Sequence, residues 1–303
     1  MKSSSTRKSS FSKILLVYKM STYHYYQRKQ RGTSPTTRIN LNRKRFLQTH
    51  RQHYATLEAV KSFFRARGIA TRTVWRGRRT DYSPYDLVVT VGGDGTFLEA
   101  ARNVLRQPVV GINSDPQWSV GRYCIADSHN LHSVLSAVLC GTFCIKQLNR
   151  LHVRTKRQPS AVNCLNDILI CHKTPAAMSR YRLNIGRINE EQRSSGIWIS
   201  TAAGSTGAIR SAGGKVLTWS GRQWQYRPRE LYAKTGKRYR LTGGVLGPLQ
   251  TMHVLSLMKD GRIYVDGAHH HLPFTIGEKV TVRVAKQPLN FIVINKKISG
   301  LEG

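Results

Sequence analysis

The sequence predicts an α/β domain with a parallel sheet, followed by an all-β domain. In the first 127 residues, short apolar runs alternate with stretches of helical apolar spacing, which is typical of parallel βα units. After a short helical stretch at 130–140, strand-like runs follow one another, which is typical of an all-β domain. We therefore place the α/β domain at 1–127 and the β-rich domain at 128–285.

The first domain is expected to contain its elements in the following order. A strand over Lys13–Tyr18 precedes a polar, basic insertion over 21–42, which has turn signals at 32–35. A helix over 49–67 then ends at Gly68, and its buried side carries Tyr54, Leu57, Val60, Phe63 and Phe64. The remaining elements are a strand near 71–75, a strand over 86–91, a helix over 96–105 and a strand over 108–112.

The second domain is expected to begin with the helix over 130–140, for which Gly141 is the stop signal. Short runs of alternating apolar residues follow it. They predict strands over 149–155, 162–171, 180–185, 197–200, 252–258, 262–265 and 279–284.

The turn between the strand at 86–91 and the helix at 96–105 reads Gly-Gly-Asp-Gly-Thr. Glycine lets a phosphate oxygen approach the backbone, and the amide groups at a helix start attract anions. A carboxylate in such a turn suits orienting a metal ion or taking a proton from an attacking hydroxyl, and these are the roles that we consider for Asp94. The alternative is an ordinary βα turn in which Asp94 caps the helix.

Two further motifs lie in the second domain. A strand-like run at 195–201 leads into a turn rich in glycine and hydroxyl groups, where Ser205, Thr206 and backbone amides could bind phosphate or ribose. Asn166 and Asp167 open another strand and form an amide–carboxylate pair that suits vicinal ribose hydroxyls. The plainer interpretations are a simple loop for the first motif and a strand-edge turn for the second.

In this order, the three motifs resemble the NAD kinase family, whose hallmarks are a GGDGT loop, an Asn-Glu or Asn-Asp pair and a T-x-x-G-S/T-T loop before Gly-Gly. The similarity runs from about Ile14 to near the C-terminus and includes segments 111–116, 224–230 and 263–267. The sequences at 113–116 and 200–206 are most similar to the plant NADH kinase and animal mitochondrial NAD kinase branch. The resemblance implies a two-domain fold with a Rossmann-like first domain, to which the final segment, 286–303, returns.

The resemblance also implies a role for each matching residue. Asp94 matches the essential aspartate that deprotonates the 2′-hydroxyl of the adenosine ribose of NAD for attack on the γ-phosphate of ATP. Mg²⁺ or another divalent cation is the implied cofactor, and no residue is assigned as its ligand. The other matches are Gly92, Gly93, Gly95 and Thr96 for the phosphates, and Asn166, Asp167, Ser195, Thr201, Gly204, Ser205, Thr206 and Gly207 for the dinucleotide.

Three positions depart from the commonest family pattern. Ser195 stands where the family has an aspartate, Ala203 where it has Ser or Thr, and Ala208 where it has a tyrosine. These changes affect the residues expected to contact the dinucleotide and leave Asp94 in place. They therefore bear on the choice between oxidised and reduced dinucleotide more than on phosphoryl transfer.

The chain carries 49 Lys and Arg against 15 Asp and Glu, a net charge of +34. A positive site would concentrate ATP and NAD(H), which are both anions. The basic residues are scattered along the sequence, and no nucleic-acid-binding module is recognisable, so nucleic acid is not the expected partner.

Cysteine and histidine give no clear site. The five cysteines include no C-x-x-C pair, and their odd number argues against a disulfide framework. Within His269–His271, successive strand residues would point to opposite faces, so at most two could share an ion. We expect no metal site built from protein side chains alone.

No stretch approaches the ~20 apolar residues that cross a bilayer, so no membrane association is expected. The N-terminal ten residues are basic and rich in serine, as in organelle transit peptides, but the first strand already begins shortly after them. We therefore expect a cytoplasmic protein. The resemblance implies a homodimer or homotetramer.

Two other functions remain open at this level. A lipid kinase of the diacylglycerol or sphingosine type would share GGDGT and a β-rich second domain, but it lacks the Ser-Thr-Ala-Ala-Gly-Ser-Thr loop. A non-catalytic protein that binds dinucleotide or a polyanion would fit the three altered positions and the basic surface, although the retained Asp94 argues against it.

Overall fold

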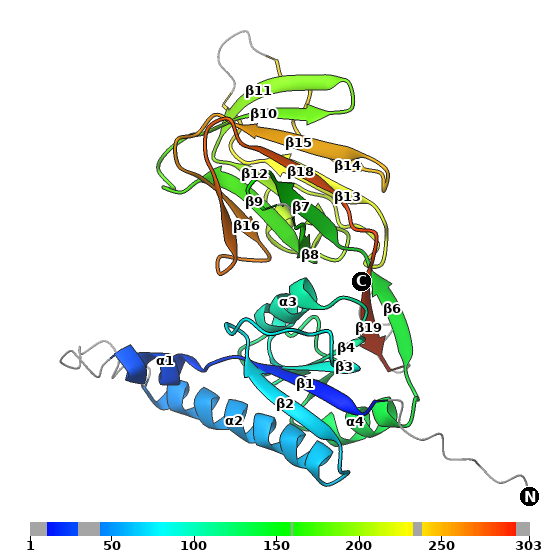
Figure 1. The fold of residues 1–303 in the computed structure, drawn as a ribbon. Helices are drawn as coiled ribbons and strands as arrows, with labels where there is room; N and C mark the ends of the chain where they lie inside the picture. The colour runs from blue at the N-terminus through cyan, green and yellow to red at the C-terminus, as the bar shows by residue number, and fades with distance from the viewer. Residues whose placement is uncertain (1–10, 30–42, 159, 233–237, 295–303) are drawn as a thin grey trace, which may run out of the picture. The chain divides into compact units, whose positions relative to one another are not determined.

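The computed structural model describes residues 11–29, 43–158, 160–232 and 238–294, and the chain divides into two compact units (Figure 1). The first, the α/β unit, consists of Met1–Lys146 together with Asn290–Leu301, and the second, the β unit, consists of Gln147–Leu289. The turn signals expected at 32–35 lie outside the described residues.

The α/β unit is built on a seven-stranded sheet with the order β2–β1–β3–β4–β19–β6, and β5 lies beside β4. Strands β1 to β4 pair in parallel, and the register joins Tyr18 to Val91 and Gly92 to Asn113. The carboxyl ends of β1, β3 and β4 therefore meet at one edge of the sheet. The strands are β1 (Lys13–Tyr18), β2 (Ala70–Trp75), β3 (Leu87–Gly92), β4 (Val109–Asn113), β5 (Ala126–Asp127), β6 (Cys144–Leu148) and β19 (Leu289–Val293).

Helices cover both faces of this sheet, which is why every residue of β3 and β4 is buried. Helix α3 (Asp94–Asn103) packs on β3 and β1, whereas α2 (Arg43–Arg65) packs on β2 and β3. Right-handed crossovers that run from β1 to one side and from β3 to the other place these two helices on opposite faces (Figure 1). Helices α1 (Thr22–Lys29) and α4 (Leu131–Leu139) complete the unit.

The β unit contains two six-stranded sheets, with the orders β11–β10–β15–β18–β7–β8 and β14–β13–β12–β9–β16–β17. We call them the first and the second sheet. The strands of the first are β7 (Leu151–Thr155), β8 (Val162–Cys164), β10 (Ser179–Ile185), β11 (Ile188–Ser194), β15 (Thr251–Ser256) and β18 (Lys279–Val284). Those of the second are β9 (Asp167–His172), β12 (Ile197–Thr201), β13 (Trp224–Pro228), β14 (Gly244–Leu246), β16 (Gly261–Val265) and β17 (His271–Phe274).

One apolar core joins the two sheets of the β unit. Alternate residues of each strand point to opposite faces of its sheet, and the inward residues of both sheets belong to a single buried cluster. Val153 and Val282 represent the first sheet in it, and Ile170, Ile199 and Ile263 the second. The neighbouring residues in each strand therefore point outward, and the two outer faces of this sandwich carry the features described below.

The predicted fold class, a parallel α/β domain followed by an all-β domain, is confirmed. The strand over Lys13–Tyr18 has the predicted bounds, and Gly68 and Gly141 take positive φ angles of 66° and 72° as helix stops. Helix α2 begins at Arg43 rather than near 49, and α1 was not expected. The expected strand over 162–171 is in fact two strands, β8 and β9, broken at Leu165 and Asn166.

The expected boundary at 127/128 differs from the division of the structure, which falls after Lys146. Helix α4 contacts α2 and β5, and the ring of His132 meets that of Phe63 edge to face at 5.6 Å between centroids. The apolar side of α4 thus completes the α/β core. The change from helical to strand patterning in the sequence marked a change in local structure and not the end of the unit.

Candidate active site

The GGDGT loop connects β3 to α3 at the carboxyl edge of the parallel sheet. Gly93 occupies the N-cap position with φ −110° and ψ −166°, and it makes no side-chain capping bond. Asp94 is the first residue of α3, so the alternative in which Asp94 is the capping residue is wrong. Its Oδ1 accepts a hydrogen bond of 2.8 Å from the backbone N–H of Tyr123, and in the described part of the chain Oδ2 has no such bond.

The glycines of this loop are required by close packing as well as by ligand access. A Cβ on Gly92 would overlap the hydroxyl of Thr96, and one on Gly93 would overlap the hydroxyl of Ser119. Gly95 is different, because it is exposed and a Cβ there would lie 3.2 Å from Nη1 of Arg76. An exposed glycine of the first helical turn therefore lies beside a guanidinium group, which is a suitable environment for a phosphate.

Two cations at the same edge of the sheet were missed at the sequence level. Lys19 follows β1 and Arg76 follows β2, and both are half-buried. Burial lowers the pKa of Lys19, and Arg76 lowers it further while Asp115 opposes the shift. Burial also lowers the pKa of Arg76, against the opposing effect of Glu99. The signal that could have found both residues is their position directly after parallel strands, the rule that already singled out Asp94.

The segment after β4 is held by a buried histidine. One ring nitrogen of His53, Nδ1, lies 2.8 Å from the hydroxyl of Ser114, and Nε2 lies 2.8 Å from the carbonyl oxygen of Lys19. Burial, together with the positive charge of Lys19, lowers the pKa of His53 to about 4, so the ring is neutral at physiological pH. His53 thus ties the Asn-Ser-Asp-Pro segment to the end of β1.

In the β unit, Asn166 and Asp167 lie where the chain passes from β8 to β9. The Asp266 carboxylate accepts hydrogen bonds from the backbone N–H groups of Leu165 (3.0 Å) and Asn166 (2.6 Å). Asp266 has a φ of +53°, an uncommon conformation that turns the chain back towards this break. Asp167 is 8% exposed, and burial, followed by the nearby charge of Asp266, raises its pKa to about 7.

The loop after β12 closes around this pair. The hydroxyl of Thr201 donates to the carbonyl oxygen of Leu165 at 2.6 Å and accepts from the N–H of Gly204 at 3.0 Å. A Cβ on Gly207 would lie 3.5 Å from both Asn166 Nδ2 and Asp167 Oδ2. Two motifs 35 residues apart in the sequence are therefore in direct contact.

The hydroxyl groups of this loop differ in their availability. Ser205 is 1% exposed, and its hydroxyl accepts a 3.0 Å hydrogen bond from the N–H of Leu217. Thr201 is 2% exposed and is bonded as described above. Thr206 and Gly207 are half-buried and accessible. Ser205 and Thr201 thus shape the loop, and the N–H groups of Gly204, Ser205 and Gly207 are also bonded within it, whereas the half-buried Thr206 is accessible to a ligand.

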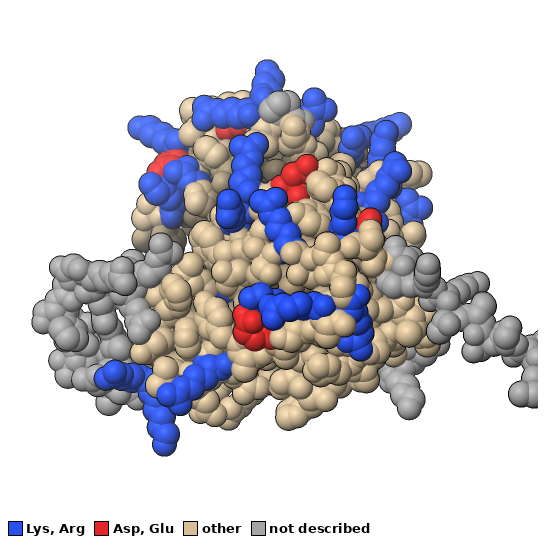
Figure 2. Space-filling view, turned by 60° about the horizontal axis from the view of Figure 1, so that its bottom comes forward, with Lys and Arg blue, Asp and Glu red and all other residues tan. Residues whose placement is uncertain are grey.

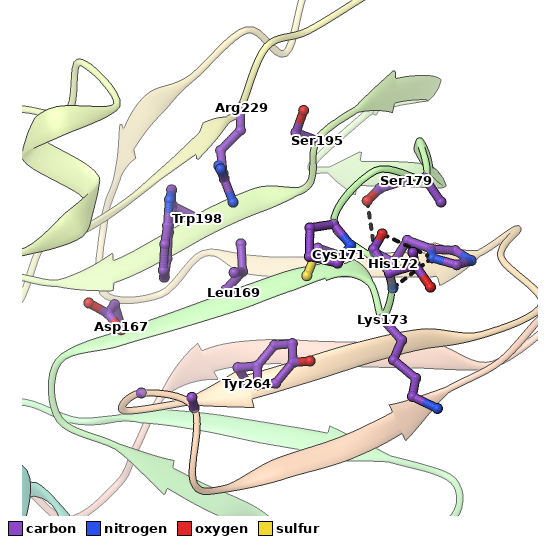
Figure 3. A pocket seen from close by; sticks show the side chains of 15 residues that line it. Asp167, Leu169, Cys171, His172, Lys173, Ser179, Ser195, Trp198, Arg229 and Tyr264 are labelled. Carbon is purple, nitrogen blue, oxygen red and sulfur yellow. Dashed lines mark hydrogen bonds between the residues drawn. The ribbon is translucent and has the colours of Figure 1, made fainter. Parts of the chain in front are cut away.

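A pocket of about 410 Å³ lies on the outer face of the second sheet (Figure 3). Trp198 and Tyr264 are both paired with Leu169 in the strand register, so the three side chains form a row across this face. Asp167 and Ser195, both singled out from the sequence, line the same pocket. Arg229 also lines it, and its side chain points towards Leu169 in Figure 3.

The aromatic residues and Arg229 in this pocket were missed, because only strand pairing brings them together. Side chains alternate between the two faces of a strand, so the sequence Ile-Trp-Ile at 197–199 could have indicated that Trp198 faces away from the core if both isoleucines face into it. The arrangement of flat aromatic side chains with a carboxylate and a cation suits a planar ring attached to a sugar.

The residues described here offer no protein-only metal site. Among the described residues, no three His, Cys, Asp or Glu side chains lie close enough to hold an ion. His271 begins β17, whereas His269 and His270 lie in the turn before it.

The parallel α/β unit with its GGDGT turn and the β-sandwich unit with its glycine-rich loop together define the class of two-domain kinases that the sequence resembles. A sequence profile described as "ATP-NAD kinase N-terminal domain" matches residues 6–141. The chain is 33% identical over 242 residues to a "Probable NADH kinase" from Oryza sativa subsp. japonica, covering 72% of this chain and 74% of the relative. It is also 33% identical over 235 residues to the "NADH kinase" of Arabidopsis thaliana, covering 68% and 72%.

Solved structures agree with this result at the level of fold. The crystal structure of an NAD kinase from Archaeoglobus fulgidus in complex with ATP has a TM-score of 0.67 and 22% identity, covering 95% of this chain and 96% of that chain. Yeast NADH kinase complexed with NADH has a TM-score of 0.64 and 15% identity, covering 94% and 84%. The chain belongs to the NAD kinase family. The lipid-kinase alternative has no support from these relatives.

Proposed function

We propose that this protein transfers the γ-phosphoryl group of ATP to the 2′-hydroxyl of the adenosine ribose of NAD(H), giving NADP(H) and ADP. The observation that carries the proposal is the position of Asp94, at the first turn of α3 and next to the exposed Gly95, which lies near Arg76. Its Oδ1 is fixed by the N–H of Tyr123, which leaves Oδ2 to accept the proton of the attacking hydroxyl. The new bond forms between the ribose oxygen and the γ-phosphorus as the bond to ADP breaks.

Arg76 and Lys19 are proposed to bind the phosphates of ATP. The negative charge in a phosphoryl transfer lies on the oxygens of the γ-phosphate and on the leaving ADP, so fixed cations nearby stabilise the transition state. Support comes from the half-buried positions of both residues and from the closeness of Arg76 to Gly95. Mg²⁺ or another divalent cation, bound through the donor phosphates, would neutralise further charge there.

Asn166 and Asp167 are proposed to bind ribose hydroxyls of the dinucleotide. A carboxylate accepts hydrogen bonds from both hydroxyls of a ribose, and a neighbouring amide can donate to them as well as accept. Their contact with Gly207 supports this proposal, since the half-buried loop residues there supply further polar groups. The nicotinamide ring would then occupy the pocket between Trp198 and Tyr264.

The pocket chemistry supports use of NADH at least as well as NAD⁺. The oxidised ring carries a positive charge that the reduced ring lacks, and Arg229 brings a positive charge to the same pocket. Ser195 stands where the family commonly has an aspartate, so no carboxylate balances the charge at that position. Asp167 is then the one carboxylate among the lining residues, so the pocket is less favourable to the cationic ring than it would be with a second carboxylate at position 195.

We further propose a homodimer or homotetramer located in the cytoplasm, as the family resemblance and the sequence suggested. No helix among the described residues is long and apolar enough to cross a membrane. Light scattering after size exclusion would give the mass of the assembly, and a monomer would contradict the first point. A fluorescent fusion found within an organelle would contradict the second.

The test of the main proposal is direct. Purified protein is incubated with ATP and Mg²⁺ and with either NAD⁺ or NADH, and each phosphorylated product is quantified. The proposal expects NADP⁺ and NADPH to form in amounts that depend on ATP, and product without ATP, or no product from either dinucleotide, would contradict it. The same assay on Asp94→Asn separates phosphoryl transfer at this site from that of a contaminant.

A further inference from the structure

The outer face of the first sheet of the β unit carries a group of basic residues on two neighbouring strands. Because Val153, Val280 and Val282 point into the core, the residues between them in sequence point outward. The outward residues are His152 and Arg154 on β7, and Lys279, Thr281 and Arg283 on β18. The register pairs Arg154 with Thr281 and His152 with Arg283, so these side chains lie side by side.

These five residues line a groove of about 470 Å³ together with Thr155, Lys156 and Ala161. Its lining includes four Lys or Arg side chains and no acidic residue. The carboxylate of Glu278, next to Lys279 in the chain, lies 3.9 Å from Arg157, which is not part of the lining. The groove is therefore a concave surface of one sign of charge.

Positive charge alone does not mark a site in this protein. Figure 2 shows Lys and Arg side chains scattered over the visible face, and on the same sheet Arg180 is paired with Arg193 in the strand register. The groove differs by being hollow and by holding a half-buried histidine. The pKa of His152 is lowered by burial and by the charges of Arg150 and Arg283, and Asn163 opposes the shift with a hydrogen bond.

The groove has a size and a charge spacing that fit a chain of phosphates. Small-molecule pockets span about 300–1,000 Å³, a range that includes this groove. Lys279 and Arg283 are four residues apart on β18, which corresponds to about 13 Å at the usual rise of a strand. A single phosphate would not span this distance, whereas a row of connected phosphates could contact both cations and Arg154 between them.

We propose that this groove is a second anion site, which binds a compact ligand carrying several linked phosphate groups. It is distinct from the pocket of Trp198 and Tyr264, because the two lie on opposite outer faces of the same sandwich. The inference does not depend on the kinase activity proposed above. It gives part of the large positive charge of this chain a specific purpose.

The test uses inorganic tripolyphosphate as the probe and the full chain as the protein. Binding is followed by calorimetry and by NMR titration of His152, identified through loss of its signal in His152→Gln. Bound phosphates stabilise the imidazolium form, so the pKa of His152 should rise at saturation. The double variant Arg154→Ala/Lys279→Ala, which leaves Arg150 and Arg283 in place, should weaken binding at this site by about tenfold or more.

The matched control is Arg180→Ala/Arg193→Ala, which removes the same charge from the same sheet outside the groove. We expect less than about a twofold change in that variant, since exposed and more distant charges are screened by salt. Equal weakening in both double variants, or an unchanged pKa of His152 at saturation, would overturn the proposal. Unchanged NADH phosphorylation by Arg154→Ala/Lys279→Ala would show that its fold is intact, and circular dichroism would serve if no kinase activity is found.

A second arm distinguishes the sources of the phosphate chain. If ATP raises the His152 pKa at lower concentration than tripolyphosphate does, the nucleoside is also recognised and a nucleotide is the occupant. If the two act equally, the phosphate chain alone is recognised. A single-stranded oligonucleotide that binds the groove and is not displaced by tripolyphosphate would contradict a compact ligand and point to nucleic acid instead.

Discussion

The GGDGT loop of the α/β unit and the Ser-Thr-Ala-Ala-Gly-Ser-Thr loop of the β unit have similar compositions but use their polar groups differently. The first loop leads into a ten-residue helix and brings the exposed Gly95 near the guanidinium of Arg76, next to the Asp94 carboxylate in the chain. The second leads into the four-residue helix α5 (Ala208–Ser211), and the hydroxyl groups of Thr201 and Ser205 form hydrogen bonds with backbone groups. The first loop thus offers charged groups to a ligand, whereas the polar groups of the second loop mainly fix the conformation of the loop itself.

This difference separates two kinds of expected effect. Changes at the GGDGT loop should act on the chemical step, because charge develops there during phosphoryl transfer. Changes around the second loop should act on the binding and the choice of the dinucleotide, and thus on KM and on ratios of kcat/KM. The following experiments test that separation.

The largest effect is expected for Asp94→Asn. An amide can still hydrogen-bond the ribose hydroxyl, but it cannot accept its proton, so kcat should fall by roughly 10²–10⁴-fold with little change in dinucleotide binding. Steady-state kinetics and a binding titration with NADH measure the two quantities. Asp81→Asn, at an exposed carboxylate of the same unit, is the control and should leave kcat unchanged. Unchanged kcat in Asp94→Asn would rule out its role as the base.

Arg76→Ala should have the next largest effect. Loss of a charge-assisted contact with the donor phosphates should lower kcat/KM for ATP by about 10- to 100-fold. Arg72→Ala removes an exposed cation from the same strand and serves as the control. A loss confined to the dinucleotide, with ATP kinetics unchanged, would assign Arg76 to the acceptor side and break the separation between the two loops.

Asp167 allows a test by pH, because binding and stability should respond in opposite directions. Its pKa is about 7 in the folded protein, above the ordinary value of 3.8 that applies to the unfolded chain. At pH values between these two pKa values, the folded state keeps the proton on Asp167 and the unfolded state releases it. The contribution of Asp167 to the free energy of unfolding is therefore complete below about pH 4 and is lost as the pH rises through about 7.

Dinucleotide binding needs the ionised carboxylate, so KM for NADH should fall as the pH rises through about 7. Asp167→Asn should remove both pH dependences while raising KM at pH 8. Denaturant unfolding and steady-state kinetics between pH 5 and 8 give the two profiles. A KM profile that Asp167→Asn leaves unchanged would mean that another group titrates.

The parts of the fold that could be predicted from the sequence are those that bury continuous apolar runs. Strand β3 and helix α3 are of this kind, since the sheet is covered on both faces. Strand β11 (Ile-Asn-Glu-Glu-Gln-Arg-Ser) was missed, because it lies at the edge of its sheet and half of it faces solvent. Its position is set by pairing with β10 through the turn at Gly186, which has a φ of +58°.

The candidate site shows the same limit. Asp94, Asn166 and Thr206 belong to short motifs whose spacing is visible in the sequence. Trp198 and Tyr264 come together only because β12 and β16 both pair with β9, and no local pattern encodes that arrangement. Arg76 was within reach of prediction, since the carboxyl end of β2 was already expected to lie at the ligand edge of the sheet.

The smallest effect is expected for the choice between NADH and NAD⁺, and it depends on the pocket charge alone. Ser195→Asp places a carboxylate in the same pocket as Arg229, so the ratio of kcat/KM for NADH to that for NAD⁺ should fall by about three- to tenfold, as expected for partly exposed charges. Arg229→Gln should move the ratio in the same direction by removing the repelling cation. Arg222→Gln, at an exposed arginine outside the pocket lining, changes the net charge equally and should leave the ratio unchanged.

A wild-type preference for NAD⁺ of about tenfold or more would contradict this view of the pocket. If all three variants moved the ratio alike, the overall charge of the protein would be responsible, and the second loop would not determine the choice of dinucleotide.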